Sequence, residues 1–277
     1  SFTASVVLDP TIPATVPGTD TGDLTSPTTR AGKGQRWAWW TGTRWDGVLP
    51  TSSGWRLYTD LTGTMVSGPV VDDRQAARVD ALFHDGTLWV ARGHTSVPRI
   101  SRYILDGGSY TADETDVALP AGLAAANGDA SPLVLFRSTN GRLWVAANNG
   151  ANVVVAVSDD DGDTWDDETV LSVSETGVAM LAQAGDTIVL LSTLNDGGGR
   201  AVRTIDQDAA DISSGEWATE ALPSLPGGIS SDDHGMAVSV GGHIYATSKT
   251  QGSESSGTPL LYLLDRDPQG TWSATTL

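Results

Sequence analysis

The residues that most often carry out catalysis or bind metals are sparse in this sequence. The four His residues lie far apart and show no His-x-x-x-His spacing, so they do not form a recognisable metal-binding motif. Asp159, Asp161 and Asp163 alternate as in a calcium loop, but the Gly and the distal Glu of an EF-hand are misplaced. The chain has no Cys, no phosphate-binding Gly-Lys-Ser/Thr loop and no Gly-x-Ser-x-Gly nucleophile elbow. We therefore predict no catalytic residue, no bound metal and no cofactor.

A second group of candidate residues lies in polar loops that follow the second and fourth strands of a repeated unit. Adjacent antiparallel strands alternate in direction, so these loops are expected to emerge on one face of the protein. Loops on a rigid scaffold often carry function, and Asn, Arg and His side chains suit hydrogen bonding to sugar hydroxyls or to a polar protein surface. The predicted ligand-binding residues are Arg92, His94, Asn148, Asn149, Arg200 and His234.

The unit that positions these loops begins with a hairpin that recurs four times. In each copy an apolar strand leads into a tight turn with Gly and then into a strand rich in β-branched or aromatic residues. The copies align on Leu88, Leu143, Ile188 and Ile244, which are 45 to 56 residues apart. A third strand, an Asp- and Gly-rich turn and a short fourth strand follow each hairpin. Each repeat therefore predicts one four-stranded sheet.

Four-stranded units of this length are typical of β-propeller blades, whose radial packing buries faces that no single blade could bury alone. We predict an all-β fold, a β-propeller of about five four-stranded blades with six as the alternative, over residues 35–277. Residues 1–34 are predicted to form an N-terminal extended arm. Its apolar strand over residues 2–8 either closes the ring by pairing with the last blade or tethers the domain to a partner. The expected inner-strand core residues are Leu82, Leu88, Val90, Leu133, Leu143, Val145, Ile188, Leu190, Ile244 and Ala246.

One turn carries a specific motif. The segment from Ser158 to Trp165 fits the pattern Ser-x-Asp-x-Gly-x-Thr-Trp at every fixed position, and weaker versions stand at equivalent places in other repeats. This pattern resembles the Asp-box of sialidases and other BNR-repeat β-propellers. In that family the box is a structural turn between the third and fourth strands, on the face opposite the ligand pocket. The resemblance implies a sialidase-like propeller in which Ser158, Asp160, Gly162, Thr164 and Trp165 are structural.

The catalytic set of that family is not evident. Sialidases hold the substrate carboxylate with an Arg triad and use a Tyr–Glu pair and an Asp in catalysis. The loops here show no evident Arg triad or Tyr–Glu pair, and Arg99-Ile100 is followed by Ser101 in place of the Pro of the family's Arg-Ile-Pro motif. The chain is also short for a complete enzyme of that family.

The charge and hydropathy of the chain bear on its partners. A formal charge of −18 opposes binding to phosphate backbones, so nucleic acid is not an expected partner. No apolar run of about 18 residues appears, so we expect no membrane insertion, and no signal peptide is visible at the start of the sequence. We expect an acidic protein located outside the cell or on a virion surface.

These observations favour a non-catalytic recognition or structural module. Such a module would be displayed on a virus or phage particle or on a cell surface, where it would bind a glycan or protein receptor. The interpretation leans against an enzyme because acid/base catalysis needs two positioned groups with separated pKa values. The alternative is a sialidase-like glycoside hydrolase or a polysaccharide lyase. Two carboxylates about 5 to 10 Å apart in a pocket would support hydrolysis.

Overall fold

The computed structural model describes residues 36–74, 77–93, 97–124, 133–149, 152–165, 169–173, 179–193, 200–228, 235–250 and 257–277. These residues form twenty β-strands and two short 3-10 helices, and the strands make five four-stranded antiparallel sheets. Within each sheet the strands lie in sequence order, so every sheet is one meander. The five sheets are called blades 1 to 5 in the order of the chain.

The bounds of the elements are as follows. Blade 1 contains β1 (Ala38–Trp40), β2 (Trp45–Thr51), β3 (Gly54–Thr59) and β4 (Val66–Asp72). Blade 2 contains β5 (Arg78–His84), β6 (Thr87–Gly93), β7 (Arg99–Asp106) and β8 (Ser109–Ala118), and is followed by η1 (Ala121–Leu123). Blade 3 contains β9 (Leu133–Arg137), β10 (Leu143–Asn148), β11 (Asn152–Ser158) and β12 (Thr169–Val173). Blade 4 contains β13 (Met180–Ala184), β14 (Thr187–Thr193), β15 (Arg200–Asp206), η2 (Ser214–Glu216) and β16 (Ala218–Glu220). Blade 5 contains β17 (Ala237–Val240), β18 (His243–Lys249), β19 (Leu261–Arg266) and β20 (Trp272–Thr276).

The four predicted hairpins are present and open blades 2 to 5. Their first and second strands pair antiparallel as β5–β6, β9–β10, β13–β14 and β17–β18. Each connecting turn contains at least one Gly at positive φ, for example Gly86 at 80° and Gly141 at 96°. Gly adopts this conformation without the steric cost that a Cβ imposes, which is why the tight turns recur at these residues.

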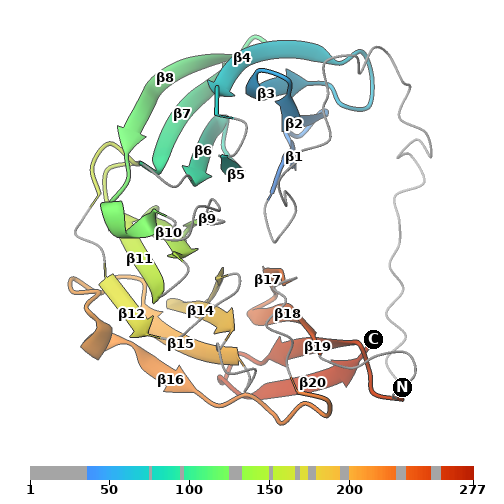
Figure 1. Ribbon diagram of the computed structural model, residues 1–277, viewed down its shortest axis with the longest axis vertical. Coiled ribbons are helices and arrows are strands. Elements are labelled where there is room, and N and C mark those ends of the chain that lie inside the picture. Colours follow the sequence, from blue (N-terminus) through green and yellow to red (C-terminus); the bar gives the residue numbers. More distant parts are fainter. Residues whose placement is uncertain are drawn as a thin grey trace.

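The blades follow one another around an axis, with the first strand of each blade innermost (Figure 1). Contacts join β1 to β5, β5 to β9, β9 to β13 and β13 to β17, whereas no comparable contact joins β17 to β1 among the described residues. Figure 1 shows the ring interrupted between blade 5 and blade 1. The structure thus confirms an all-β, propeller-like fold with five four-stranded sheets, and the described residues leave the ring open.

The core consists of four apolar layers, one between each pair of successive blades. Nine of the ten predicted core residues are buried, whereas Leu82 is partly buried and packs against the layer between blades 2 and 3. Alternate residues of an inner strand serve two layers: Leu143 and Val145 pack toward blade 2, while Trp144 and Ala146 pack toward blade 4. This double burial explains why the inner strands read as nearly continuous apolar runs.

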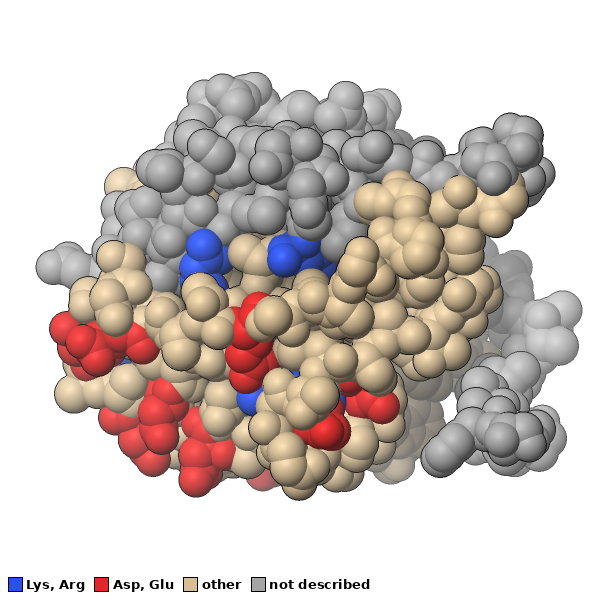
Figure 2. All heavy atoms as spheres, turned by 90° about the horizontal axis from the view of Figure 1, so that it is seen from below, with Lys and Arg blue, Asp and Glu red and all other residues tan. Residues whose placement is uncertain are grey.

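One face of the molecule displays many acidic side chains. Figure 2 looks from the lower side of Figure 1, where the outer strands of blades 4 and 5 lie, and shows Asp and Glu side chains gathered there with few Lys and Arg. No helix in the described ranges is long and apolar enough to cross a membrane. The predicted arm, residues 1–34, lies outside the described residues.

Candidate functional site

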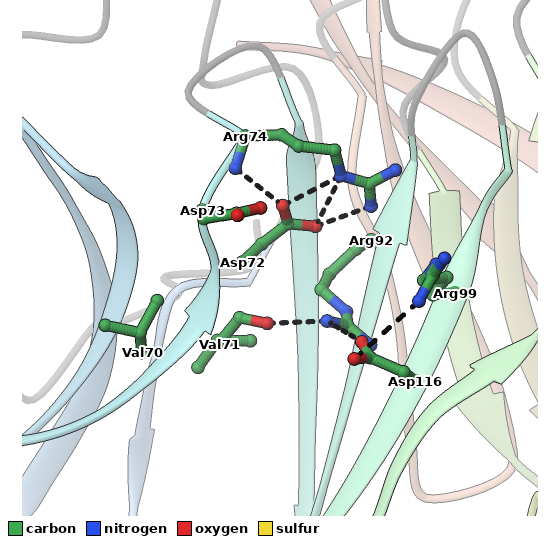
Figure 3. Close-up of a pocket in the computed structure, with 8 residues that line it drawn as sticks. All are labelled: Val70, Val71, Asp72, Asp73, Arg74, Arg92, Arg99 and Asp116. Carbon is green, nitrogen blue, oxygen red and sulfur yellow. Dashed lines mark hydrogen bonds and ion pairs between the residues drawn. The ribbon is translucent and has the colours of Figure 1, made fainter.

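A cavity of about 570 Å³ opens between blades 1 and 2. It lies where β4 leaves blade 1 and where β6 ends and β7 begins, on the face formed by the loops that follow second and fourth strands. Figure 3 shows its lining side chains, which come from four different strands and one connection. The lining residues are Val70, Val71, Asp72, Asp73, Arg74, Arg92, Arg99 and Asp116.

Asp72 and Arg74 form the wall contributed by blade 1. The pairing of β3 with β4 shifts register next to Val71, and such a bulge bends the end of the strand. Arg74 donates from Nε to Asp72 Oδ1 at 2.9 Å and from Nη2 to Oδ2 at 2.6 Å. The backbone N–H of Arg74 adds a third bond to the same carboxylate at 2.8 Å. The Asp72 carboxylate is almost fully buried, at 1% exposure, and the two-pronged contact from the Arg74 guanidinium holds it in one orientation.

The ion pair shifts the pKa of both partners. Burial opposes ionisation of Asp72, but the hydrogen bonds and positive charge of Arg74 outweigh it and hold the pKa of Asp72 below its ordinary value. The pKa of Arg74 is raised, chiefly by its hydrogen bond to Asp72. Both groups therefore remain charged at neutral pH, and one wall of the cavity carries a fixed dipole.

The lowered pKa of Asp72 predicts how stability depends on pH. Because this pKa is lower in the folded state than the ordinary unfolded value of about 3.9, its contribution is present above that value and is lost as pH falls through the folded pKa. Asp72→Asn removes charged hydrogen bonds and is expected to cost about 1.5–3 kcal/mol at neutral pH. Urea denaturation at pH 7 and at about pH 3 measures both effects. If Asp72→Asn lost as much stability on acidification as the wild type, the lowered pKa of Asp72 would be contradicted.

Asp116 is brought into the cavity by a second bulge, in β8. Ile100 pairs with Val117 whereas Arg102 pairs with Glu114, so the single residue Ser101 on β7 faces two residues on β8. Asp116 takes φ of 59°, which is uncommon for a residue with a Cβ. Its backbone N–H donates to Ser101 Oγ at 3.1 Å. Bulges redirect side chains, and of the four Asp residues with positive φ in the described structure only Asp116 lines this cavity.

Two arginines contact this carboxylate. Arg92 Nη1 donates to Asp116 Oδ1 at 2.9 Å, and Arg99 Nη1 lies 3.7 Å from Asp116 Oδ2. Arg92 also donates to the Val71 carbonyl at 2.5 Å and to Ser101 Oγ at 2.8 Å, and its side chain is 3% exposed. Arg99 and Asp116 are 40% and 55% exposed. The buried Arg92 therefore links β4, β7 and β8 through its hydrogen bonds, while Arg99 and Asp116 face the open part of the cavity.

Tyr103 lies close to Ser101 and to the charge of Arg92. It is buried at 3% exposure and belongs to the apolar layer between blades 1 and 2. Burial raises the pKa of its hydroxyl, partly offset by the charge of Arg92 and a hydrogen bond to Ser101, so it stays protonated at neutral pH.

The cavity thus collects three guanidinium groups and three carboxylates that are scattered over 45 residues of sequence, from 72 to 116. The sequence showed no Arg triad, yet Arg74, Arg92 and Arg99 line one cavity. Guanidinium groups bind oxygen-rich ligands, and exposed carboxylates can accept sugar hydroxyls or transfer protons. The exposed carboxylates of the cavity are those of Asp73 and Asp116.

The predicted ligand-binding residues do not form one cluster within the described structure. Arg92 lines the cavity, but its guanidinium is buried and both of its Nη nitrogens already donate hydrogen bonds. Asn149 shapes its own turn: its Nδ2 donates to the Gly122 carbonyl at 2.9 Å, and its Oδ1 accepts from the Asn152 N–H. Arg200 is buried at the start of β15, with Nε donating to Ser248 Oγ at 3.0 Å. His94, His234 and the side chain of Asn148 lie outside the described residues.

The turn from Ser158 to Trp165 closes on itself through its own side chains. Ser158 Oγ accepts from the Gly162 N–H at 2.8 Å and donates to Asp160 Oδ1 at 2.8 Å. Asp160 accepts from the N–H and the hydroxyl of Thr164 at 2.8 and 2.6 Å, and these bonds lower the pKa of Asp160. Gly162 has φ of 97°, and Trp165 packs against the layer between blades 2 and 3. The turn leads out of β11, the third strand of blade 3, on the opposite face from the cavity.

Breaking this turn is expected to affect stability without affecting function. Asp160→Ala removes two acceptors from an exposed turn and is expected to cost about 0.5–1.5 kcal/mol. Thermal unfolding measures this cost, and ligand binding per folded molecule is expected to stay the same. Loss of binding at an unchanged melting temperature would instead place the turn in the functional site.

The structure contains no group of three or more His, Asp or Glu side chains, among those it describes, that is arranged to hold a metal ion. A second cavity, of about 420 Å³, lies beside the Ser158–Trp165 turn and is lined by residues that include Trp89, Arg102 and Arg137. Arg102 is held there by Asp113 at 2.6 Å and by Asp163 at 2.8 Å. These pairs tie β7, β8 and the turn of blade 3 together.

Comparison with known proteins supports the fold. No protein-family model matches the chain, and no curated protein sequence matches it. Among solved structures, an ulvan lyase from a new family of polysaccharide lyases aligns with a TM-score of 0.51 and 11% identity, over 88% of this chain and 72% of the lyase. At this identity the likeness shows a shared propeller-like fold and not a shared activity.

Two further structures have lower similarity. Xylan β-1,4-xylosidase from Bacillus halodurans C-125 aligns at a TM-score of 0.46 and 12% identity, over 92% of this chain and 59% of the xylosidase. The endo-arabinase of Bacteroides thetaiotaomicron VPI-5482 aligns at 0.48 and 13% identity, over 87% and 95% of the two chains. The chain spans less than two thirds of the xylosidase and of a Bacteroides ovatus xyloglucan-locus protein, of which it covers 56%.

The prediction of a non-catalytic recognition or structural module, and the prediction against an enzyme, are corrected by the fold that this chain shares with the ulvan lyase. That protein is a polysaccharide lyase, which is one of the enzyme classes named in the alternative prediction. None of the similar structures supports the predicted virion assembly or receptor-binding role, and none is specific to Asp-box sialidases. The absence of an evident sialidase catalytic set does not exclude an enzyme, because a propeller can carry different catalytic sets on the same scaffold.

Proposed function

We propose that this chain is a glycan-active enzyme, a glycoside hydrolase or a polysaccharide lyase, and that the cavity between blades 1 and 2 is its active site. The observation that carries the proposal is Asp116, a carboxylate at a strained bulge that two arginines hold in a cavity of about 570 Å³. Its carboxylate is more than half exposed, so it is accessible to a ligand.

The lining residues fit distinct roles. Asp116 serves as the base or nucleophile, because the guanidinium groups of Arg92 and Arg99 orient its carboxylate and balance its charge. Asp73 is the second exposed carboxylate of the cavity and serves as the proton-transfer partner. Arg99 donates to sugar oxygens. Arg92 and the Asp72–Arg74 pair keep the walls in place.

The cavity is suited to carbohydrate by its polarity and its position. Glycan ligands present many hydroxyl groups, which guanidinium and carboxylate groups bind in both directions, as donors and as acceptors. The site lies at the rim of two packed blades, so its side chains come from strands whose backbones are fixed by the apolar layer beneath. The Ser158–Trp165 motif further supports placing the scaffold among Asp-box propellers.

Product analysis tests the proposal and separates the two reaction types. The purified chain is incubated with a panel of neutral and acidic polysaccharides, and the products are assayed for new reducing ends and for the ultraviolet absorbance of an unsaturated uronate. Hydrolysis yields reducing ends alone, whereas elimination yields a reducing end together with an unsaturated one. Absence of any product from the whole panel, with a folded protein, would count against the proposed function.

A further inference from the structure

The open side of the ring leaves one sheet face of blade 5 uncovered. Met236, Val238 and Val240 are 59%, 54% and 58% exposed. Val238 pairs with Tyr245, which pairs in turn with Asp265, so the side chains of these three residues share one face of the sheet. Met236 and Val240 lie on the same face, because alternate residues of a strand point to the same side. Exposed apolar side chains that gather on one face usually mark a surface that another element covers.

The opposite face of blade 5 is buried against blade 4. Ile244, Ala246 and Leu264 are buried there in the layer shared with blade 4. Of the eleven exposed large apolar residues in the described part of the chain, six belong to blade 5 or its flanking residues. The exposed apolar surface is therefore concentrated where the ring is interrupted between blade 5 and blade 1 (Figure 1).

Arg36, the first described residue, lies beside this face. Arg36 is anchored near the axis, where its N–H donates to Asp80 Oδ1 at 2.7 Å and its guanidinium bonds to Asp80 Oδ2 at 2.6 Å and to the Leu135 carbonyl. It also lines a small cavity together with Gly235 and Met236. The first described residue therefore lies next to the inner end of the uncovered face.

The sequence of the segment that precedes Arg36 has the pattern of a strand with one apolar face. Phe2, Ala4, Val6 and Leu8 alternate with the residues between them, two of which are polar, as expected for a half-buried strand. The 27 residues 9–35 separate Leu8 from Arg36, and an extended chain advances about 3.3 Å per residue. A four-stranded sheet is only about 15 Å wide at a strand spacing of about 4.8 Å, so the segment can reach every part of the face.

We propose that residues 1–35 of this chain dock on the uncovered face of blade 5, with Phe2, Ala4, Val6 and Leu8 against Met236, Val238 and Val240. The arm then acts as the missing layer of the open ring. It packs on the face of the last blade, which already has four strands, and does not add a strand to its edge. A second copy of the chain or an unrelated partner on the same face would give different results in the test below.

Thiol labelling tests this docking directly, because the natural chain has no Cys. Val238→Cys places one thiol on the face, and its labelling rate is measured in the full chain and in the same chain carrying Phe2→Asp and Val6→Asp. If the arm covers the face, the two Asp substitutions are expected to raise the rate by about tenfold or more, which corresponds to about 1.4 kcal/mol of docking. Thr3→Asp with Ser5→Asp, on the other side of the strand, is expected to leave the rate unchanged.

A thiol at an exposed turn, Thr43→Cys, controls for general reactivity and is expected to label equally in all backgrounds. Circular dichroism confirms that each variant is folded. Equal labelling of Val238→Cys with and without the Asp substitutions would overturn the proposal. Protection that instead rises with protein concentration would assign the face to a second copy and would also overturn it.

Discussion

Replacing Asp116 by Asn is expected to lower kcat/KM on a cleaved glycan by about 10²–10⁴, the range for loss of a group that transfers a proton or attacks in the transition state. Asn keeps the size of the side chain and tolerates the left-handed backbone at φ of 59°, so the bulge is expected to stay intact. Stability is expected to change little in comparison, because the side chain is 55% exposed.

Asp113→Asn is the matched control for this variant. Asp113 lies on the same strand, is 44% exposed and also pairs with an arginine, Arg102, but it does not line the cavity. Its replacement is expected to leave kcat/KM within about twofold of the wild type, as for a surface ion pair. Equal losses in the two variants would show that Asp116 acts through folding or general charge, and equal activity of Asp116→Asn and wild type would remove it from the active site.

Replacing Leu143 by Ala is expected to cost about 2–5 kcal/mol of the free energy of unfolding. Leu143 is fully buried in the layer between blades 2 and 3, and its Cδ1 lies 3.4 Å from the position that a Cβ on Gly162 would occupy. The variant therefore leaves a cavity beneath the turn as well as between the blades. Chemical denaturation measures the loss.

Ile104→Ala provides the comparison, since Ile104 is 38% exposed on β7 and leaves no enclosed cavity when truncated. Its cost is expected to stay below about 1 kcal/mol. A Leu143→Ala variant as stable as Ile104→Ala would mean that the layer between blades 2 and 3 is not the packed core described above.

The fold was predictable because its signals are local. Apolar strands joined by Gly turns identify the hairpins, and the spacing of Leu88, Leu143, Ile188 and Ile244 identifies the repeat. The structure confirms the five sheets and nearly all of the predicted core. The opening between blade 5 and blade 1 was not predictable in this way, since closure depends on how the blades are spaced around the axis and no local pattern reports that spacing.

The candidate site was largely missed, for a related reason. Asp116 lies in an ordinary polar stretch of sequence, and only the register shift opposite Ser101 turns it into the cavity. Arg92 was predicted as a ligand-binding residue from its loop position. In the structure its guanidinium donates hydrogen bonds to the Val71 carbonyl, Ser101 and Asp116. Bulges and buried ion pairs arise from tertiary pairing, so sequence patterns alone could not place these groups together.

The most direct test of the account is to find where a cleaved glycan binds. The Asp116→Asn variant is mixed with an oligosaccharide that the wild type cleaves, and amide hydrogen exchange is compared with and without the ligand. The account predicts slower exchange at the end of β6, the start of β7 and the bulge of β8, which surround the cavity. Slower exchange confined to blades 4 and 5, or to the Ser158–Trp165 turn on the opposite face, would contradict it.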